Sequence, residues 1–452
     1  MGFLRKLRNK ALAKSLDFCE ECIVKFDIGD ARQRFFIGYS GGVDSHVLLH
    51  VCASIAQLKG RLTAVYIHHG LQQEADAWAV HCEKTAKNLN VEFLTLRVNA
   101  KPMPGESPEE AARNARYSAL KSLLQCNDVL LLAQHQEDQL ETVLLQLFRG
   151  SGLRGLSGMP EQAVFGKGVM LRPLLNTPKQ AISDYANTHQ LNWVEDPSNQ
   201  SNAYDRNFLR NALLPQLKQR WPAVDKTVAR SAKHCAEAQR LVEEVANELF
   251  SAVFNPADKT LSISQLLEHR LHLQQIILRH WFRHLGLKMP SQAVVERILT
   301  QVIGADEQRD PMLSGQGYTI RRYRDKLYCL PPSAPETPQN CVWPAGQTSV
   351  TLAGNQVLSY LPSSTGILLE HWQQAMVDVK FRSGGELISL PGRQGRHTLK
   401  NLFQEAAIPP WERDAIPLIY LNDVLSAVGD LYISAAFYSE KTQGCIKLLL
   451  QR

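Results

Sequence analysis

Apolar runs alternate with amphipathic helical patterns over the first part of the chain, from residue 34 to about residue 175. Five short apolar runs predict strands: Phe35–Tyr39, Leu62–His68, Val91–Val98, Val129–Gln134 and Val169–Leu175. Four segments between them have apolar residues at helical spacing: Ser45–Leu58, Glu74–Asn88, Pro108–Gln125 and Glu137–Phe148. This alternation predicts an α/β fold with a doubly wound parallel sheet, in which ligands bind at the carboxyl ends of the strands.

The pattern changes twice after this first domain. Helical spacing dominates from about Val224 to Arg309, and Tyr318–Leu330 predicts a β-hairpin. The proline-rich stretch Pro331–Pro338 predicts a linker, and the residues beyond it predict a small β-rich module. We therefore expect an α/β domain at 1–215, a mostly helical domain at 216–330, a linker at 331–340 and a C-terminal domain at 341–452.

A glycine-rich turn, Ser40-Gly41-Gly42-Val43-Asp44-Ser45, stands between the first predicted strand and the first predicted helix. We call it the glycine loop. Backbone N–H groups and the positive end of a helix dipole converge at such a turn and favour an anion. Gly41 and Gly42 permit positive φ and a close approach, and the two serines add hydroxyl donors. Because the loop lacks the lysine of a Walker A motif, it suits pyrophosphate during chemistry at an α-phosphate.

Polar clusters follow two other predicted strands at the same edge of the sheet. His68-His69-Gly70-Leu71 follows the second strand, and the stretch from His135 to Thr142 follows the fourth. Asp138 and Glu141 are three residues apart and share one face of the coming helix. Two interpretations stay open at this point. The carboxylates either pair with the helix dipole or hold Mg²⁺ or a cationic substrate.

The motifs together resemble a known family. The glycine loop matches the PP-loop of the N-type ATP pyrophosphatases. Seven further motifs of the family follow the glycine loop in the same order along the chain. They are His68–Leu71, Glu110–Arg113 with Arg116-Tyr117, Glu141–Leu145, Phe148–Leu156, Arg172-Pro173-Leu174, Glu195–Asn199 and Arg206-Asn207. This series resembles the bacterial tRNA(Ile)-lysidine synthases and covers the N-terminal half densely. Glu137 stands where that family often has Asp.

The resemblance implies an ATP-dependent ligase that uses Mg²⁺. It would join L-lysine to C2 of the wobble cytidine in the CAU anticodon of tRNA(Ile), through an adenylated cytidine, with release of AMP and pyrophosphate. The glycine loop would bind ATP, and Asp44 would be the essential carboxylate and the candidate Mg²⁺ ligand. Asp138 and Glu141 would hold the lysine ammonium or the metal, and Arg113 would neutralise phosphate or the bound base. Arg206 and Arg210, four residues apart, are candidates for the anticodon stem.

Basic, glycine-rich loops mark the C-terminal module. Their cations are Lys380, Arg382, Arg393, Arg396 and Lys400. Such loops suit the phosphate backbone of tRNA, which positions an RNA without reading its sequence, although a solvated surface is the local alternative. The surrounding strings also resemble the C-terminal domain of the same family, which implies RNA binding.

Composition adds limits on the partners and the location. The chain has 452 residues, a net charge of +6 and nine scattered cysteines. The mild basic excess is compatible with nucleic acid, and the cysteine usage fits a reducing cytosol, so we expect a cytoplasmic protein. Cys19 and Cys22 fall in a helical stretch, where we expect two thiols on a helix face and no metal site. We expect no signal peptide and no membrane span. A homodimer stays open.

Three other functions compete with this interpretation. A PP-loop tRNA thiolase would need cysteines near the active site after the glycine loop, whereas Cys52, Cys82 and Cys126 lie far from one another in the sequence and Cys19 and Cys22 precede the loop. An amidotransferase synthetase would need a glutaminase nucleophile, and no motif marks one. A non-enzymatic tRNA-binding protein would leave the intact glycine loop unexplained.

Overall fold

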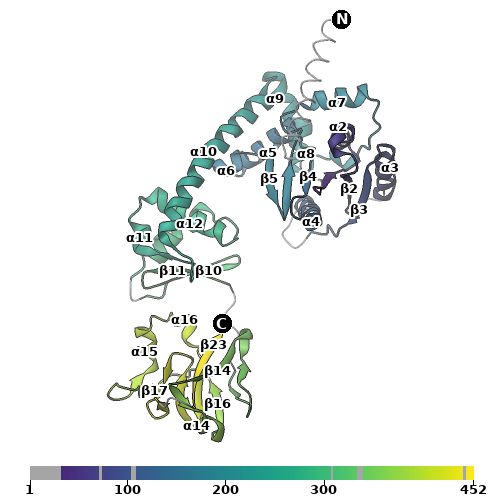
Figure 1. Cartoon of the computed structure of the whole chain (residues 1–452). Helices are drawn as coiled ribbons and strands as arrows, with labels where there is room; N and C mark the ends of the chain where they lie inside the picture. The colour runs from purple at the N-terminus through teal and green to yellow at the C-terminus, as the bar shows by residue number, and fades with distance from the viewer. Residues whose placement is uncertain are drawn as a thin grey trace. The chain divides into compact units, whose positions relative to one another are not determined.

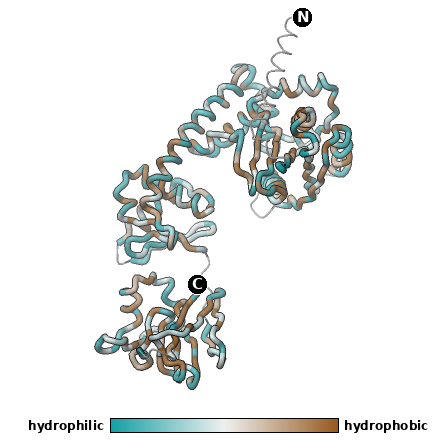
Figure 2. The backbone as a smooth tube through the Cα atoms, in the orientation of Figure 1, coloured by the Kyte–Doolittle hydropathy of each residue, from teal (hydrophilic) through white to brown (hydrophobic). Residues whose placement is uncertain are grey.

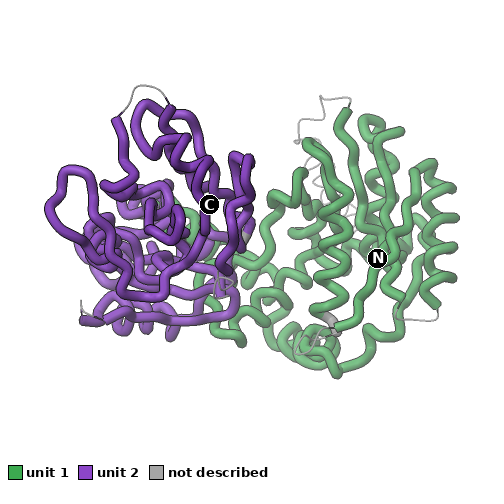
Figure 3. The backbone as a smooth tube through the Cα atoms, turned by 90° about the horizontal axis from the view of Figure 1, so that it is seen from below, with its two compact units in different colours: residues 1–244 green, residues 245–452 purple. Residues whose placement is uncertain are grey.

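The computed structural model describes residues 32–70, 74–102, 108–306, 309–332, 339–440 and 444–451. The chain divides into two compact units, residues 1–244 and residues 245–452, shown in green and purple in Figure 3. Each unit is considered separately. Cys19, Cys22 and most of the predicted linker (333–338) lie outside the described residues. The bounds of the four predicted segments stay predictions.

The first unit is built on a six-stranded sheet in the order β3-β2-β1-β4-β6-β5 (Figure 1). Its strands are β1 Phe35–Gly38, β2 Leu62–His68, β3 Glu92–Arg97, β4 Val129–Leu131, β5 Gln162–Phe165 and β6 Gly168–Leu171. Neighbouring strands pair in parallel except β5 and β6, which form an antiparallel hairpin. The predicted doubly wound α/β class and all five predicted strands are confirmed. The sequence analysis missed β5.

Helices cover both faces of this sheet. The longer ones are α2 Val43–Ser54, α3 Ala75–Asn88, α4 Pro108–Leu123, α5 Gln136–Phe148 and α7 Lys179–Thr188. The long helix α10 Val224–Val253 follows them in the chain and crosses the boundary between the units. Shorter ones are α6 Leu153–Leu156, α8 Asp205–Phe208, the π-helix η3 Leu209–Leu213 and α9 Leu214–Arg220. The first predicted helix ends earlier than expected, at Ser54, and a 3₁₀ turn, Ala56–Leu58, follows it. The sequence analysis did not predict α7.

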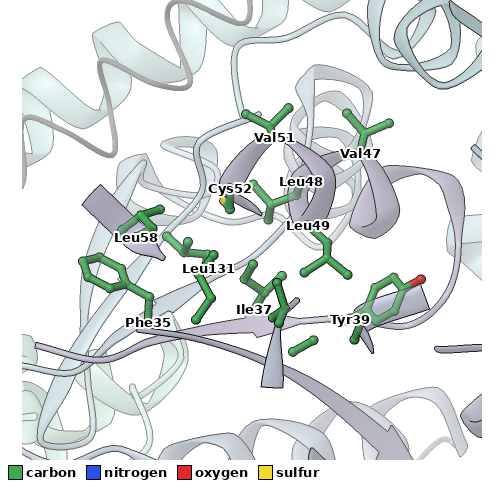
Figure 4. Close-up of a cluster of buried hydrophobic side chains, with 14 of the residues drawn as sticks. Phe35, Ile37, Tyr39, Val47, Leu48, Leu49, Val51, Cys52, Leu58 and Leu131 are labelled. Atoms are coloured by element: carbon green, nitrogen blue, oxygen red, sulfur yellow. The ribbon is translucent and has the colours of Figure 1, made fainter. Parts of the chain in front are cut away.

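Strand β1 contributes side chains to the hydrophobic cores on both faces of the sheet. Its side chains alternate between the two faces, so Phe35 and Ile37 join one core cluster while Phe36 joins the other. The first cluster includes buried residues of α2, α3 and α7, and Figure 4 shows Ile37 beneath the helix α2 and Phe35 beneath Leu58. The second cluster includes Leu120 of α4. The buried strand and helix therefore hold both ends of the glycine loop.

The second unit begins with helices that pack on a five-stranded antiparallel sheet, β7-β8-β11-β10-β9. Its helices are α11 Ile263–Leu267, α12 Leu271–His284, α13 Gln292–Arg297 and the π-helix η4 Ile298–Ile303. Its strands are β7 Phe254–Asn255, β8 Thr260–Ser262, β9 Met312–Gly315, β10 Tyr318–Tyr323 and β11 Lys326–Leu330. Strands β10 and β11 confirm the predicted hairpin. Trp281 and Phe282 are fully buried, as core residues are. Hydrophobic and hydrophilic stretches both occur along the backbone of this unit in Figure 2.

The C-terminal module is β-rich, as predicted. Two antiparallel five-stranded sheets have the orders β12-β16-β19-β20-β21 and β13-β14-β23-β15-β22. The first contains Cys341–Val342, Val377–Lys380, Leu418–Leu421, Val424–Val428 and Tyr432–Ile433, and the second contains Ser349–Thr351, Val357–Ser363, Cys445–Gln451, Gly366–Leu368 and Tyr438–Ser439. A small pair, Leu387–Ile388 with His397–Thr398, and the helices α14 Leu369–Gln374, α15 Leu399–Glu405 and α16 Pro410–Arg413 complete it. Among the helices that the structure describes, none combines the length and the apolar character needed to cross a membrane.

Candidate active site

The glycine loop joins β1 to α2 and has one backbone position that requires glycine. Gly41 has φ of +84°, which L side chains rarely adopt. A Cβ atom there would also lie 2.9 Å from the Sγ atom of Cys82. Gly42 has φ of −72° and is the N-cap of α2, so of the two glycines Gly41 is the one that uses the positive φ that glycine permits. Because glycine has no side chain to cap the helix, the first N–H groups of α2 stay open toward a ligand.

The two serines of the loop first of all hold the loop itself together. The Ser45 hydroxyl donates to the Gly42 carbonyl at 2.9 Å, and the Ser40 N–H donates to the Ser45 Oγ atom at 3.2 Å. The two hydroxyl oxygens lie 3.2 Å apart. The predicted hydroxyl donors therefore sit side by side at the turn. Their hydrogen bonds fix the shape of the loop.

Asp44, in the first turn of α2, contacts two residues that the sequence analysis did not select. Its Oδ1 atom lies 2.5 Å from the ammonium of Lys179, and its Oδ2 atom lies 3.7 Å from Nε2 of His135. His135 stands in the polar cluster after β4, so the sequence contained a signal for it. Lys179 opens α7 and belongs to no motif. The structure therefore adds a lysine and a histidine to the predicted carboxylate.

At the start of α5, Asp138 both caps the helix and faces the other polar residues of the site. His135 is the N-cap, and its Nδ1 atom accepts from the Glu137 N–H at 3.2 Å. The His135 N–H in turn donates to Oδ2 of Asp138 at 2.9 Å. The same carboxyl oxygen lies 3.4 Å from Nε2 of His135. Asp138 thus caps the helix and also faces the histidine that reaches Asp44.

Asp138 and Glu141 share a face of α5, as predicted, and that face meets two arginines. Arg206 and Arg210 each place Nε within hydrogen-bond distance of Glu141, at 2.8 and 2.7 Å, and Nη2 of Arg210 lies 3.0 Å from Oδ1 of Asp138. The Glu141 side chain is completely buried. Burial by itself would raise the pKa of Asp138, but the electrostatic effects of His135 and Arg206 outweigh it and lower that pKa. We call Asp138, Glu141, Arg206 and Arg210 the carboxylate–arginine cluster.

Arg113 lies in a second group of cations, on α4 and at the end of β6. The guanidinium of Arg113 lies over the Tyr117 ring, 4.9 Å from its centroid, and Arg116 lies at 5.6 Å. Burial alone would raise the pKa of Tyr117, but Arg113, Arg116 and Arg172 lower it. Nε of Arg172 donates to Gln134 at 3.1 Å, next to His135 in the chain. Arg172 is buried, whereas Arg113 is exposed, so Arg113 is the member of this group that can reach a ligand.

Comparison with known proteins decides the family. Residues 11–217 match the model described as "PP-loop domain", residues 261–328 match "TilS substrate binding domain", and residues 377–450 match "TilS substrate C-terminal domain". The chain is 42% identical to the tRNA(Ile)-lysidine synthase of Methylococcus capsulatus over 399 residues, which are 87% of this chain and 90% of that protein. The chain belongs to the tRNA(Ile)-lysidine synthase family. The resemblance found in the sequence is thereby confirmed.

Two further members of the family show similar agreement. The enzyme of Alkalilimnicola ehrlichii is 40% identical over 410 residues, covering 89% of this chain and 91% of that protein. The enzyme of Histophilus somni is 38% identical over 421 residues, covering 88% and 95%. Family membership covers the chain almost from end to end. It assigns no role to a single side chain, so the predicted roles of the site residues stay predictions.

The candidate tRNA-binding cations of the C-terminal module fall into two groups. Lys380 lies 3.2 Å from Asp423, Arg382 lies 3.6 Å from Asp414, and Arg393 lies 2.8 Å from Glu405. Arg396 and Lys400 are exposed. The first three cations therefore have carboxylates as neighbours. The other two extend into solvent.

A magnesium ion at this site would depend on Asp44 and on the phosphates of a bound nucleotide. Within the described residues, no three His, Cys, Asp or Glu side chains gather in a way that could hold a metal ion by themselves. Mg²⁺ is commonly bound by one or two carboxylates together with substrate phosphates. Asp44 at the start of α2 fits that pattern. Its carboxylate could hold Mg²⁺ together with phosphates bound at the glycine loop.

Proposed function

We propose that this protein joins L-lysine to C2 of the wobble cytidine in the CAU anticodon of tRNA(Ile), with ATP as the energy source. The supporting observation is a single edge of the sheet that carries the glycine loop, Asp44 and the carboxylate–arginine cluster. Identity of 38–42% with named tRNA(Ile)-lysidine synthases supports the same substrates. The PP-loop match over residues 11–217 supports the use of ATP.

In the first step, the cytidine O2 atom attacks the α-phosphate of ATP, and pyrophosphate leaves. Negative charge then develops on the pyrophosphate oxygen. Backbone N–H groups at the start of α2 are preorganised to stabilise that charge without reorganising during the reaction. Mg²⁺, held by Asp44, would neutralise phosphate oxygens. Arg113 lies on the exposed side of its cation group and would neutralise the phosphate or the adenylated base.

In the second step, the lysine ε-amine attacks C2, and AMP leaves. The incoming ammonium must be held and must lose a proton before it can attack. The Asp138 side chain is 15% exposed, whereas the Glu141 side chain is fully buried. We therefore assign the direct contact with the ammonium to Asp138, and Glu141 supports it by fixing the two arginines. Because Nδ1 of His135 accepts from the Glu137 N–H, its Nε2 atom carries the ring proton and faces the carboxylates of Asp44 and Asp138. The Asp138 carboxylate is therefore the group placed to accept the proton of the ammonium.

Arg206 and Arg210 would contact the anticodon stem while they also hold Glu141 and Asp138. Each guanidinium has five N–H donors, and the contacts with Glu141 and Asp138 leave donors for a second partner. Their side chains are 22% and 38% exposed. An RNA phosphate could therefore bind to arginines that the protein already holds in place. Such a contact would bring the anticodon next to Asp138.

Incorporation of lysine into RNA tests this function directly. The full chain is incubated with ATP, radiolabelled lysine and bacterial tRNA, and the label in RNA is counted. We expect label that depends on ATP and on tRNA(Ile), and we expect Asp44→Asn to keep less than about a tenth of it. Asp44→Asn should fold normally, since a charge in the first turn of a helix contributes only about 1 kcal/mol or less. If the RNA stays unlabelled and is instead modified in a reaction that requires sulfur, the proposed function is wrong and the protein is a tRNA thiolase.

A further inference from the structure

The glycine loop has a carboxylate and lacks a cation of its own. Its six residues include Asp44 and no lysine or arginine, although the loop is proposed to hold the phosphates of ATP. A carboxylate at this place repels phosphate unless a positive charge offsets it. The structure supplies such a charge from a distant part of the chain. The ammonium of Lys179 lies 2.5 Å from Oδ1 of Asp44.

The fold holds Lys179 at this position. Lys179 is the first residue of α7, and Ile182, Tyr185 and Ala186 of this helix are buried in the same core cluster as α2. The Tyr185 hydroxyl lies 2.8 Å from Nδ1 of His50 on α2, so a hydrogen bond also joins the two helices. The backbone of Lys179 is therefore fixed relative to the glycine loop. Only its side chain is left to move.

The chemistry of the side chain suits a phosphate oxygen. A lysine ammonium carries three donors on a flexible stem of four carbons, so it can keep Asp44 as a partner and still donate to a ligand. Both side chains of the pair are 30% exposed, which leaves one side open to solvent. Lysine is the residue that many phosphate loops use as a point charge. Lys179 has that charge in a loop that lacks one.

We propose that Lys179 is the missing cation of the glycine loop. In the free protein it offsets the charge of Asp44, and with ATP bound it donates to a phosphate oxygen of the β–γ pair. When the cytidine attacks, the bond between the α-phosphorus and the bridging oxygen breaks, and its electron pair stays on the pyrophosphate. Lys179 keeps its proton and stabilises that charge. The last role rests on the proposed function, whereas the phosphate contact rests on the loop alone.

Binding of inorganic pyrophosphate to the full chain, measured by calorimetry without tRNA, lysine or ATP, tests the contact. Loss of a charge-assisted hydrogen bond weakens binding by about 10- to 100-fold, so we expect this loss in Lys179→Met. Lys179→Arg should restore most of it. Lys218→Met is the matched control, because Lys218 is also 30% exposed and forms an ion pair with the carboxylate of Glu137. The control should bind pyrophosphate as the unmodified chain does.

A second background separates direct contact from simple neutralisation of Asp44. In Asp44→Asn, there is no carboxylate charge for Lys179 to offset. We expect Lys179→Met to weaken pyrophosphate binding in this background too, by about tenfold or more. If the effect of Lys179→Met disappears in Asp44→Asn, or never exceeds that of Lys218→Met, the proposal is wrong.

The outcome is independent of the RNA chemistry. Pyrophosphate binding requires neither tRNA nor lysine. If the chain fails to incorporate lysine but Lys179→Met weakens pyrophosphate binding as expected, the proposed function alone is rejected. Normal incorporation by Lys179→Met with unchanged pyrophosphate affinity would reject Lys179 alone.

Discussion

The carboxylate–arginine cluster and the basic loops of the C-terminal module use the same kind of ion pair in opposite settings. Glu141 is fully buried between Arg206 and Arg210, whereas Arg393 and its partner Glu405 are 47% and 54% exposed. Removing one partner of a buried pair leaves a charge without compensation, while an exposed pair contributes about 0–1 kcal/mol. Buried pairs thus fix geometry. Exposed pairs can exchange a carboxylate for a phosphate at little cost.

The largest expected effect breaks the buried cluster. Glu141→Gln should lower the free energy of unfolding of the first unit by about 3 kcal/mol, the low end for a broken buried pair, because the arginines keep some solvent contact. Urea unfolding measures this loss. The matched variant Glu405→Gln should cost less than about 1 kcal/mol. Equal costs for the two variants would remove the distinction between the regions.

The next effect concerns the lysine substrate. Asp138→Asn should raise the KM for lysine by about 10- to 100-fold, because the ammonium loses a charge-assisted hydrogen bond. Steady-state kinetics with varied lysine gives this number, and the KM for ATP is the internal control. An unchanged lysine KM with an altered dependence on Mg²⁺ would move Asp138 to the metal.

The basic loops predict a smaller effect that depends on salt. Each cation that contacts a duplex phosphate adds about 0.9 to the slope of log affinity against log salt. Arg396→Ala with Lys400→Ala should therefore flatten the slope for tRNA by about 1.8. The triple variant at Lys380, Arg382 and Arg393 should flatten it less per residue, because the neighbouring carboxylate still offsets part of each charge after the cation has exchanged it for a phosphate. A slope that falls more in the triple variant would mean that ion pairing in the free protein does not predict RNA contact.

The smallest expected effect is acid sensitivity at the contact between α2 and α7. Burial, and then the neighbouring His189, lower the pKa of His50. Between that lowered value and the ordinary value of 6.5, the unfolded chain binds more protons than the folded chain. The stability of the first unit should therefore fall as pH falls below about 6.5. Urea unfolding from pH 7.5 to 5.5 measures this fall, and His50→Gln should reduce it. An unchanged fall in His50→Gln would assign the acid sensitivity to other groups.

Local pattern predicted the first unit well because its signals are short-range. The bounds of β2 agree with the prediction at both ends, and the glycine loop lies where a buried strand meets a helix. Strand β5 escaped because it has only four residues, and its short apolar run, Ala163–Phe165, cannot be told from a loop by pattern alone. An edge strand of this kind takes its place from pairing with β6.

The partners of the site residues could not be predicted from spacing. Lys179 is 135 residues from Asp44, and Arg206 and Arg210 are 65 and 69 residues from Glu141. The sequence marks each residue as charged, but only the packing of α7 against α2 and of α8 against α5 brings the charges together. Sequence analysis therefore found the carboxylates and the arginines separately. It did not show that they form one cluster.

The most direct test of the central claim follows both products of ATP cleavage. The full chain is mixed with tRNA(Ile) and ATP labelled in the α-phosphate, first without lysine and then with it. We expect pyrophosphate release and label attached to RNA before lysine is added, and release of labelled AMP with loss of RNA label once lysine is present. Label attached to lysine and never to RNA would mean that the protein activates the amino acid and not the cytidine. That result would contradict the account.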